Sequence, residues 1–550
     1  MAPISQLLPD LLTSSGPLGI AVLGFALCVL ALYAVDQHVL SPSWPKGVAV
    51  LREPAGARRF SLRNRLAFHL DSISIHREAW DKYLSKGKPV IIPSTGFGSE
   101  IMLPPTSYRW LSSQPDNVAS VWEAFAQFDR VYYSLGAHKY ITDPYQGMLV
   151  KTEMNPMLEA IVAAMNDELG FVFDMHLGNV PGEWKEIELQ PVVGFIVAQA
   201  ASRFTVGLPL CRNQDYIRNC LAITKNLFIT AGTGAVLPRV LEPLACRLAS
   251  LPLKSKVALF RKHVEPIHRE RLALLKRQDP NQPNDHFQLI LKYAQRERPE
   301  ELEDTDCMAR RLCVANFGSM HQTAIQVTNL ILNILGSDAE FNTIAALRDE
   351  MRRVLNSDGD VSGWTKAKVS KMLKADSVAR ETLRLQSFGG RANFRKILVD
   401  GVKTDDGIEL PKGSIVSMMS KMPQTDEKIY PDDPLKFDPF RFSRMRETAD
   451  AKSDKAGENG GPTAAPPPPV SFVTTSLDHM PFGHGKHACP GRFLVDFELK
   501  MIMAYLLTHY DVEFPNEYNG QRPPNVYVTE AHFPPAGARI RVRRRESPAI

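Results

Sequence analysis

One cysteine lies in a loop whose composition suits metal binding. The segment 481–492, PFGHGKHACPGR, places Cys489 just before an apolar stretch, FLVDFELKMIMAYLL, that predicts a helix. Gly483 and Gly485 allow the backbone to turn tightly and to lie close against a flat ligand. Backbone amides and the positive end of the helix should lower the pKa of the Cys489 thiol and favour the thiolate. Such a thiolate would be a soft, electron-rich metal ligand.

Three other roles for Cys489 compete with this one. Most lone cysteines are structural. A zinc site could combine Cys489 with His484 and His487, but no CxxC or HxxxH partner is nearby to complete four ligands. A nucleophilic cysteine would need a general base and an oxyanion hole, and the sequence identifies neither.

The spacing resembles the haem-binding loop of the cytochrome P450 family, F-x-x-G-x-x-x-C-x-G. Phe482, Gly485, Cys489 and Gly491 meet all four fixed positions. The resemblance implies a haem b cofactor (iron protoporphyrin IX) with the thiolate of Cys489 as the axial metal ligand. It also implies that Phe482 and Gly483 lie against the cofactor.

Two further residues are candidates for binding the haem propionates. His487 stands where the family more often has arginine, and its charge would depend on pH. Arg395, in RANFRKI, falls where the family commonly has an arginine directed at a propionate. A guanidinium suits a carboxylate because it can donate two parallel hydrogen bonds. The alternative for Arg395 is an exposed position at the start of a strand.

A second set of residues supports the resemblance. Glu381 and Arg384 are three residues apart on a predicted helix and therefore share one face. Alone, such a pair is usually a surface ion pair worth about 0–1 kcal/mol. The pair resembles the E-x-x-R motif of the family, and Arg441 in FDPFRF matches the arginine that pairs with it. The resemblance implies a structural rather than a catalytic role for all three.

The family carries an oxygen-side motif, A/G-G-x-D/E-T-T, on a long central helix. Residues 318–323, GSMHQT, stand at that place: His321 replaces the acid, Gln322 replaces the first threonine and Thr323 is retained. The resemblance implies that these three are the catalytic candidates for proton delivery. His321 would titrate near neutral pH, with Gln322 or Thr323 ordering water. The alternative is that His321 and Gln322 only pack the helix.

These residues must be positioned by a mainly α-helical protein with a small β part. Apolar periodicity predicts one helix over 306–335, ending at Gly336, and about 30 residues at ~1.5 Å each would span a domain. Strands are predicted at 396–402, 414–419 and 540–543. The polar, Pro/Gly-rich segment 448–469 predicts a disordered insertion. The resemblance implies the cytochrome P450 fold, with a catalytic domain over 61–550.

The N-terminal region predicts a membrane anchor. Residues 17–35 are nearly all apolar, and a bilayer requires about 20 such residues. A cleaved signal peptide is the alternative, but a basic n-region and a cleavage site are both missing. Asp10 is the one charged residue before the span, and six basic residues follow it by position 65. We therefore expect residues 1–36 to form a luminal tail and transmembrane helix, 37–60 a Pro-rich linker, and the remainder to lie in the cytosol.

Composition limits the class of protein further. A net charge of +5 over 550 residues is too slight to indicate nucleic-acid binding, and no such motif is present. The seven cysteines show no CxxC pair, which fits a reducing compartment. With the anchor, the resemblance implies a single-pass enzyme of the endoplasmic reticulum membrane. Its electrons would come from a separate NADPH-dependent reductase, with a cytochrome b-type protein as a second candidate donor.

The resemblance also implies an activity, namely oxidation of a hydrophobic small molecule by hydroxylation, epoxidation or several successive steps. The loop FGHGKHACPGRF and His321 look closest to fungal members that act on terpenoids, polyketides or polyketide–peptide hybrids. Two alternatives stay open: a haem-thiolate isomerase or dehydratase that does not use dioxygen, and a non-catalytic haem-binding protein. The family layout implies that the substrate contacts segments 105–135, 200–235, 314–323, 387–392 and 527–533.

Overall fold

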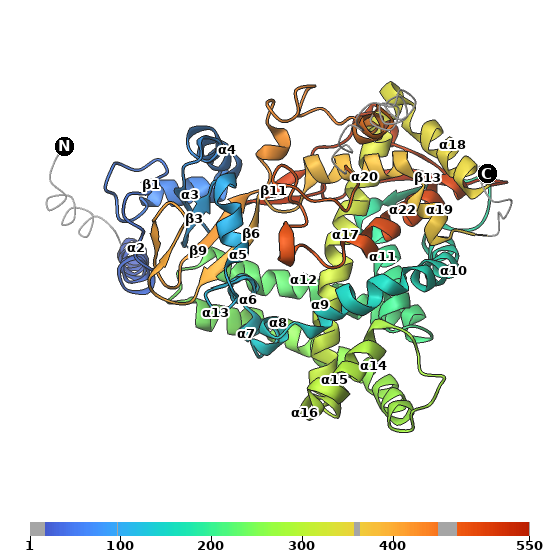
Figure 1. Ribbon diagram of the computed structural model, residues 1–550, viewed down its shortest axis with the longest axis horizontal. Coiled ribbons are helices and arrows are strands. Elements are labelled where there is room, and N and C mark those ends of the chain that lie inside the picture. The colour runs from blue at the N-terminus through green and yellow to red at the C-terminus, as the bar shows by residue number, and fades with distance from the viewer. Residues whose placement is uncertain (1–16, 96, 357–362, 449–469, 549–550) are drawn as a thin grey trace, which may run out of the picture.

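Helices dominate the computed structural model, which describes residues 17–95, 97–356, 363–448 and 470–548. The mainly α class predicted from the sequence is confirmed (Figure 1). The helices are α2 (Pro17–Val35), α3 (Leu62–Leu70), α4 (Ser72–Lys82), α5 (Tyr108–Ser113), α6 (Val121–Phe128), α7 (Val131–Ser134), α8 (Lys139–Thr142), α9 (Tyr145–Leu149), α10 (Leu158–Leu177), α11 (Leu189–Thr205), α12 (Gln214–Val236), α13 (Glu242–Ala249), α14 (Leu251–Lys276), α15 (His286–Glu297), α16 (Pro299–Leu302), α17 (Thr305–Phe341), α18 (Thr343–Leu355), α19 (Lys366–Ser370), α20 (Leu373–Gln386) and α22 (Arg492–His509).

The strands of the described residues form a six-stranded sheet and three smaller ones. The large sheet has the order β1-β2-β3-β9-β6-β4, with β1 (Ala49–Val50), β2 (Val90–Pro93), β3 (Ser99–Leu103), β9 (Ile415–Met419), β6 (Arg391–Ile397) and β4 (Ala119–Ser120). A three-stranded sheet contains β10 (Tyr510–Glu513), β13 (Arg539–Arg544) and β5 (Trp184–Glu188). Two hairpins pair β11 (Val526–Val528) with β12 (Ala531–Phe533) and β7 (Val402–Lys403) with β8 (Glu409–Leu410).

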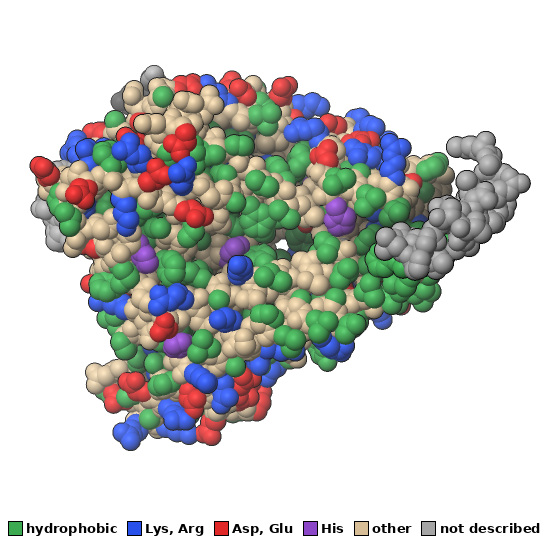
Figure 2. Space-filling model, turned by 180° about the vertical axis from the view of Figure 1, so that it is seen from behind, with side chains coloured by type: hydrophobic (Ala, Val, Ile, Leu, Met, Phe, Trp, Pro, Cys, Tyr) green, Lys and Arg blue, Asp and Glu red, His purple; other side chains and the backbone are tan. Residues whose placement is uncertain are grey.

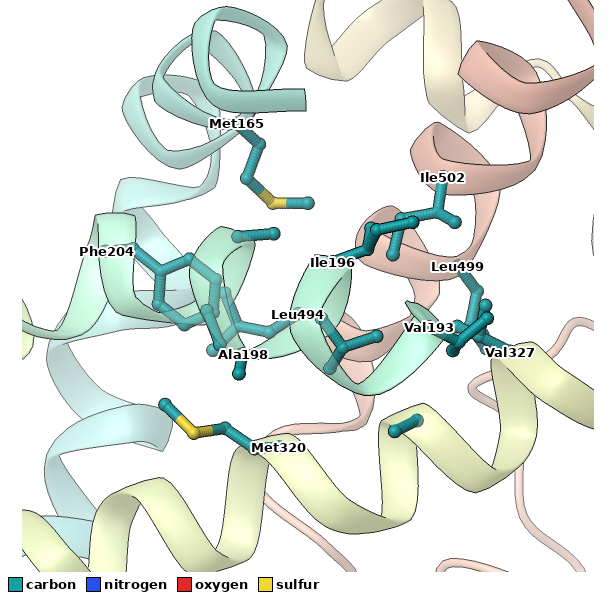
Figure 3. Close-up of a cluster of buried hydrophobic side chains, with 14 of the residues drawn as sticks. Met165, Val193, Ile196, Ala198, Phe204, Met320, Val327, Leu494, Leu499 and Ile502 are labelled. Carbon is teal, nitrogen blue, oxygen red and sulfur yellow. The ribbon is translucent and has the colours of Figure 1, made fainter. Parts of the chain in front are cut away.

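Helix α17 crosses the middle of the molecule (Figure 1). Its first turn is capped by Asp304, whose carboxylate accepts hydrogen bonds from the amides of Asp306 and Cys307. From Thr323 to Leu335 every residue is buried, because neighbouring helices cover α17 on all sides. Figure 3 shows side chains of α10, α11, α17 and α22 packed together, among them Met320 and Leu494.

The predicted end of this helix is wrong. Helix α17 continues through Gly336 to Phe341 and ends at Asn342, whose φ of 50° is left-handed. Gly336 lies at a close approach, since a Cβ there would come within 2.8 Å of the Cβ of Arg522. The glycine therefore provides room for a neighbouring segment instead of terminating the helix.

Two of the three predicted strands agree with β9 and β13, and the third is displaced. Strand β6 covers Arg391–Ile397, whereas the prediction was 396–402, and Gly401 with a φ of +77° lies in the turn that follows. The predicted insertion at 448–469 falls, beyond its first residue, outside the described residues.

The segment 37–60, predicted to be a Pro-rich linker, contacts the rest of the described protein. Its residues Ala49–Val50 form β1, an edge strand of the large sheet. Gln37 is buried and donates a 3.0 Å hydrogen bond to the carbonyl of Phe97, and Phe60 is buried against Trp44. The prolines of this segment predicted an extended chain. The apolar side chains between them pack the segment against the rest of the protein. Before this segment, α2 is long and apolar enough to cross a membrane, by length and composition only.

Candidate active site

The loop around Cys489 is tightly folded before α22 begins. The amide of Cys489 donates a 2.8 Å hydrogen bond to the carbonyl of Phe482, and a 3₁₀ turn spans Gly485–His487. Gly483 and Gly485 have φ values of +68° and +77°, where a side chain would be strained. At Gly485 the hydroxyl of Tyr108 also occupies the space that a Cβ would need. Both glycines are therefore required by the shape of the loop.

The charge state of Cys489 differs from the prediction. Burial raises the pKa of the thiol, while hydrogen bonds from the amides of Gly491 and Arg492 and the charge of Arg492 oppose the rise. The predicted donors are present, but burial outweighs them. A coordinated metal cation would supply the missing stabilisation, because it deprotonates a thiol ligand outright.

Arg395 and His487 lie on the same side of the loop. Arg395 is 2% exposed, donates to the carbonyl of Phe394 at 2.7 Å and has no partner at Nε. Within the part of the chain that the structure describes, no carboxylate forms an ion pair with it. By contrast, Arg391 on the same strand pairs with Glu100 and Glu530. Arg395 is thus a buried cation without an ion-pair partner, although the charge of Asp116 acts on it, and it is not the exposed residue of the alternative interpretation.

His487 is held by an acidic neighbour. Its Nε2 atom lies 3.1 Å from a carboxylate oxygen of Asp116. Burial and the nearby Arg395 guanidinium lower the pKa of His487, and Asp116 only partly opposes them. The imidazole therefore favours its neutral form near pH 7.

Helix α17 has one open position in an otherwise enclosed stretch. Gly318 is exposed, and nothing lies within 4 Å of where its Cβ would be. Gln322 is four residues further and lies on the same face of the helix. The hydroxyl of Thr323 donates a 2.7 Å hydrogen bond to the carbonyl of Ser319, and Thr323 is 2% exposed. Gln322 rather than Thr323 therefore shares the open face.

His321 faces α12. Its ring lies 4.4 Å from that of Phe228, centroid to centroid, and its Nε2 atom has no partner. Burial lowers its pKa to about 4. The prediction that His321 titrates near neutral pH is therefore wrong, because the sequence does not reveal how fully its surroundings exclude water.

Glu381, Arg384 and Arg441 come together as predicted. Arg384 donates two 2.7 Å hydrogen bonds to the carboxylate of Glu381, and both side chains are fully buried. Arg384 also donates to the carbonyls of Gln424 and Pro434 at 2.6 Å each. Arg441 reaches Glu381 at 3.3 Å. The set connects α20 to residues 424–441, which fits a structural role.

A cavity of about 60 Å³ lies between α7, α12 and α17. Leu135, Leu227, Phe228 and Phe317 line it, and these belong to three of the five segments predicted to contact substrate. Aromatic contacts extend to the other two: Phe388 lies 6.2 Å from Phe228 and 5.2 Å from Phe533, between ring centroids. The five segments therefore meet on one side of α17.

The comparisons with known proteins agree with this arrangement. The family model for cytochrome P450 matches residues 148–534. The chain belongs to the cytochrome P450 family. It is 45% identical over 531 residues to the cytochrome P450 monooxygenase pbrC of Penicillium brasilianum, covering 96% of each chain. It is also 45% identical to the monooxygenase astC of Aspergillus terreus over 526 residues, covering 94% of this chain and 95% of the relative.

A solved structure shows the same P450 fold. The retinoic acid-bound cyanobacterial CYP120A1 has a TM-score of 0.60 at 18% identity, over 88% of this chain and 96% of that one. The cytochrome P450 monooxygenase tenB of Beauveria bassiana is 40% identical, with 96% of each chain covered. This protein is accordingly a haem-thiolate monooxygenase of fungal type, with haem b and an axial cysteine thiolate.

The residues of the site fit a haem. The cofactor is a flat dianion around a metal cation, and the site offers one half-buried loop cysteine, one buried guanidinium without an ion-pair partner, and one open helix position. The other cysteines of the catalytic body are fully buried. A propionate would supply the carboxylate that Arg395 lacks.

Three residues near the loop were not found from the sequence. The side-chain oxygen of Asn393 accepts a 3.0 Å hydrogen bond from the amide of His484, and Asn393 has a left-handed φ of 54°. The ring of Tyr108 lies tilted against that of His484 with centroids 4.8 Å apart, and a carboxylate oxygen of Asp116 lies 3.1 Å from Nε2 of His487. Tyr108 and Asp116 fall within the predicted segment 105–135, but their types alone gave no signal.

Proposed function

We propose that Cys489 is the axial ligand of this P450 and that the enzyme oxidises a hydrophobic intermediate of fungal secondary metabolism, a terpenoid, polyketide or polyketide–peptide. The observation that carries the proposal is the position of Cys489 just before α22, with two backbone amides directed at its sulfur. The haem, when bound, supplies the activation of dioxygen.

Arg395 and His487 would bind the haem propionates, while Phe482 and Gly483 would lie against the ring. The buried guanidinium of Arg395, which forms no ion pair among the described residues, supports the first assignment. In its neutral form, His487 would still donate one hydrogen bond to a propionate. Asp116 lies beside the same imidazole, 3.1 Å from Nε2. Glu381, Arg384 and Arg441 would hold the fold around the site without touching substrate.

On the opposite side, Gln322 would order water at the open face of α17 next to Gly318. His321 would act as a neutral hydrogen-bonding group and not as an acid, because its pKa is lowered to about 4. Thr323 would relay a proton through its hydroxyl, which now donates to Ser319. These roles follow the family motif. The open space at Gly318 supports the role of Gln322, whereas Thr323 would first have to release its hydrogen bond to Ser319.

The carbon-monoxide difference spectrum of the reduced protein tests the ligand. We expect wild type to show the red-shifted Soret band of a thiolate-bound haem, and Cys489→Ala to lose it. Cys28→Ser, which changes an exposed cysteine of α2, should keep the band. A wild type without the band, or a Cys489→Ala variant that retains it, would refute the proposal.

The proton-delivery assignment is tested by complementing a deletion strain of the producing fungus with variants. Gln322→Ala and Thr323→Ala should lower the ratio of oxidised product to unoxidised precursor about tenfold or more, as loss of positioned proton transfer does. Thr328→Ala is the matched control, because Thr328 makes the same kind of hydrogen bond, 2.8 Å to the carbonyl of Ala324. Equal effects at 323 and 328 would exclude a catalytic Thr323.

Membrane attachment and redox partners complete the proposal. We infer a single-pass anchor in the endoplasmic reticulum, a cytosolic catalytic domain, and electron supply from an NADPH-dependent P450 reductase or a cytochrome b-type protein. Exposed leucines on α3 (Leu62, Leu66 and Leu70) and on α13 (Leu244 and Leu248) support a membrane-facing side. Figure 2 shows hydrophobic side chains gathered at the N-terminal end of the molecule, beside the grey chain.

A further inference from the structure

The small cavity beside α17 contains one acidic side chain. Asp129 follows the last residue of α6 and lines the cavity together with Leu227, Phe228, Val314 and Phe317. Val314 and Phe317 lie within about one turn of the open position Gly318. The cavity is therefore next to the oxygen side of the site, and its walls around Asp129 are mainly apolar.

The carboxyl group of Asp129 has no partner. The backbone of Asp129 is satisfied, since its amide donates to the carbonyl of Phe125 at 2.9 Å and its carbonyl accepts from the hydroxyl of Ser134 at 3.3 Å. No hydrogen bond or ion pair of its side chain is found among the described residues, and Asp129 is half-buried. Burial raises the pKa of Asp129 to about 7, although the charge of Arg130 opposes the rise. A carboxyl group without a hydrogen-bond partner among mainly apolar walls is available to a ligand.

The neighbouring Arg130 is occupied elsewhere. Its guanidinium contacts the carbonyl of Gln127, donates to the carbonyl of Gly234 at 3.0 Å and pairs with Glu242 at 3.1 Å. Its φ of 50° is left-handed, so the chain makes a corner between α6 and α7 at this residue. Contacts with α12 and α13 hold that corner, so the charge of Arg130 acts on Asp129 without forming an ion pair with it.

We propose that Asp129 recognises a hydrogen-bond donor on the substrate, a hydroxyl or N–H group, and so orients the substrate for oxidation. The inference rests on the proposed function, because it takes the cavity as part of the substrate site. A site with one buried acceptor in apolar walls discriminates strongly against ligands that lack the matching donor. The substrate would thus be an apolar molecule that already carries a polar group.

Binding of a matched pair of probes tests the proposal. The ferric enzyme is titrated with 4-hydroxybiphenyl and with biphenyl, and dissociation constants are taken from the shift of the Soret band. For wild type, the dissociation constant of the hydroxylated probe should be at least about tenfold lower than that of biphenyl, equivalent to ~1.4 kcal/mol. Asp129→Leu should reduce the preference below about twofold, while Asp129→Asn, which keeps an acceptor oxygen, should retain most of it.

Controls separate this inference from the proposed function. Every variant must first show the Soret band of a thiolate-bound haem with carbon monoxide. If wild type lacks this band, the haem assignment is refuted, and not the role of Asp129. Glu123→Leu removes a carboxylate from α6 outside the cavity and should leave the preference intact. If Asp129→Leu does not fold, Asp129→Ala takes its place. A wild type that binds neither probe or shows no preference, or a preference that survives loss of the carboxyl group, would overturn the proposal.

Discussion

At the scale of single residues, Arg395 gives the sharpest prediction. Arg395→Leu should release haem faster, by about 10- to 100-fold, because hydrogen bonds to charged groups contribute about 1.5–3 kcal/mol. Arg395→Lys should restore part of the loss, since it keeps the charge without the paired donors. The rate of haem transfer to excess apomyoglobin measures the effect.

Lys396→Gln is the matched control, because it removes a positive charge from the adjacent position of β6. Haem release from Arg395→Leu no faster than from Lys396→Gln would show that Arg395 does not contact the cofactor.

Residue identities were predictable where a motif fixes both type and spacing. Cys489 and the Glu381–Arg384–Arg441 set could be named from the sequence, and the last three are in contact as expected. Charge states were not predictable. The pKa of His321 depends on Phe228, about ninety positions away, and that of Cys489 on how completely the loop is buried.

At the scale of elements, the connection between α20 and residues 424–441 should be cooperative. Glu381→Gln removes the negative charge and one of the two acceptor oxygens from a fully buried Glu–Arg pair, and breaking such a pair costs about 3–5 kcal/mol. We expect a marked fall in the denaturation midpoint, followed by helical circular dichroism, together with loss of bound haem.

The control for this substitution is Asp349→Asn, which breaks the exposed ion pair of α18 with Arg353. An exposed pair contributes at most about 1 kcal/mol, so the midpoint should hardly move. Similar losses in both variants would mean that the Glu381 set does not stabilise the fold.

Element types were easier to predict than their ends. Periodicity located α17, β9 and β13, but Gly336 was taken for a helix terminus because the approach of Arg522 is a tertiary contact. Strand β6 was displaced for a related reason: its first residue, Arg391, is charged, and it is buried through its ion pair with Glu100, a tertiary contact.

At the scale of the whole molecule, the anchor and the body should contribute separately to membrane attachment. Deletion of residues 1–35 removes α2 but leaves Asp36 and Gln37, which are buried in the body. The truncated protein should fold and bind haem, yet stay partly with microsomes through its exposed leucines. Adding Leu66→Lys and Leu70→Lys should release it to the supernatant on sedimentation.

Leu435→Lys serves as the control, since Leu435 is 65% exposed on another part of the surface. Release by Leu435→Lys as complete as that by the α3 substitutions would contradict a membrane-facing side at α3.

The contact between Tyr108 and Gly485 has a consequence for how the family can diverge. The left-handed φ of Gly485 keeps this position without a side chain, and the hydroxyl of Tyr108 fills the space that is left. A shorter residue at position 108 would leave that space beside the loop empty. Position 108 lies in a segment that we expect to face substrate, so a change of substrate through this tyrosine would be restricted by the loop that carries Cys489. Substitution at position 108 is therefore limited by the loop that holds the metal ligand.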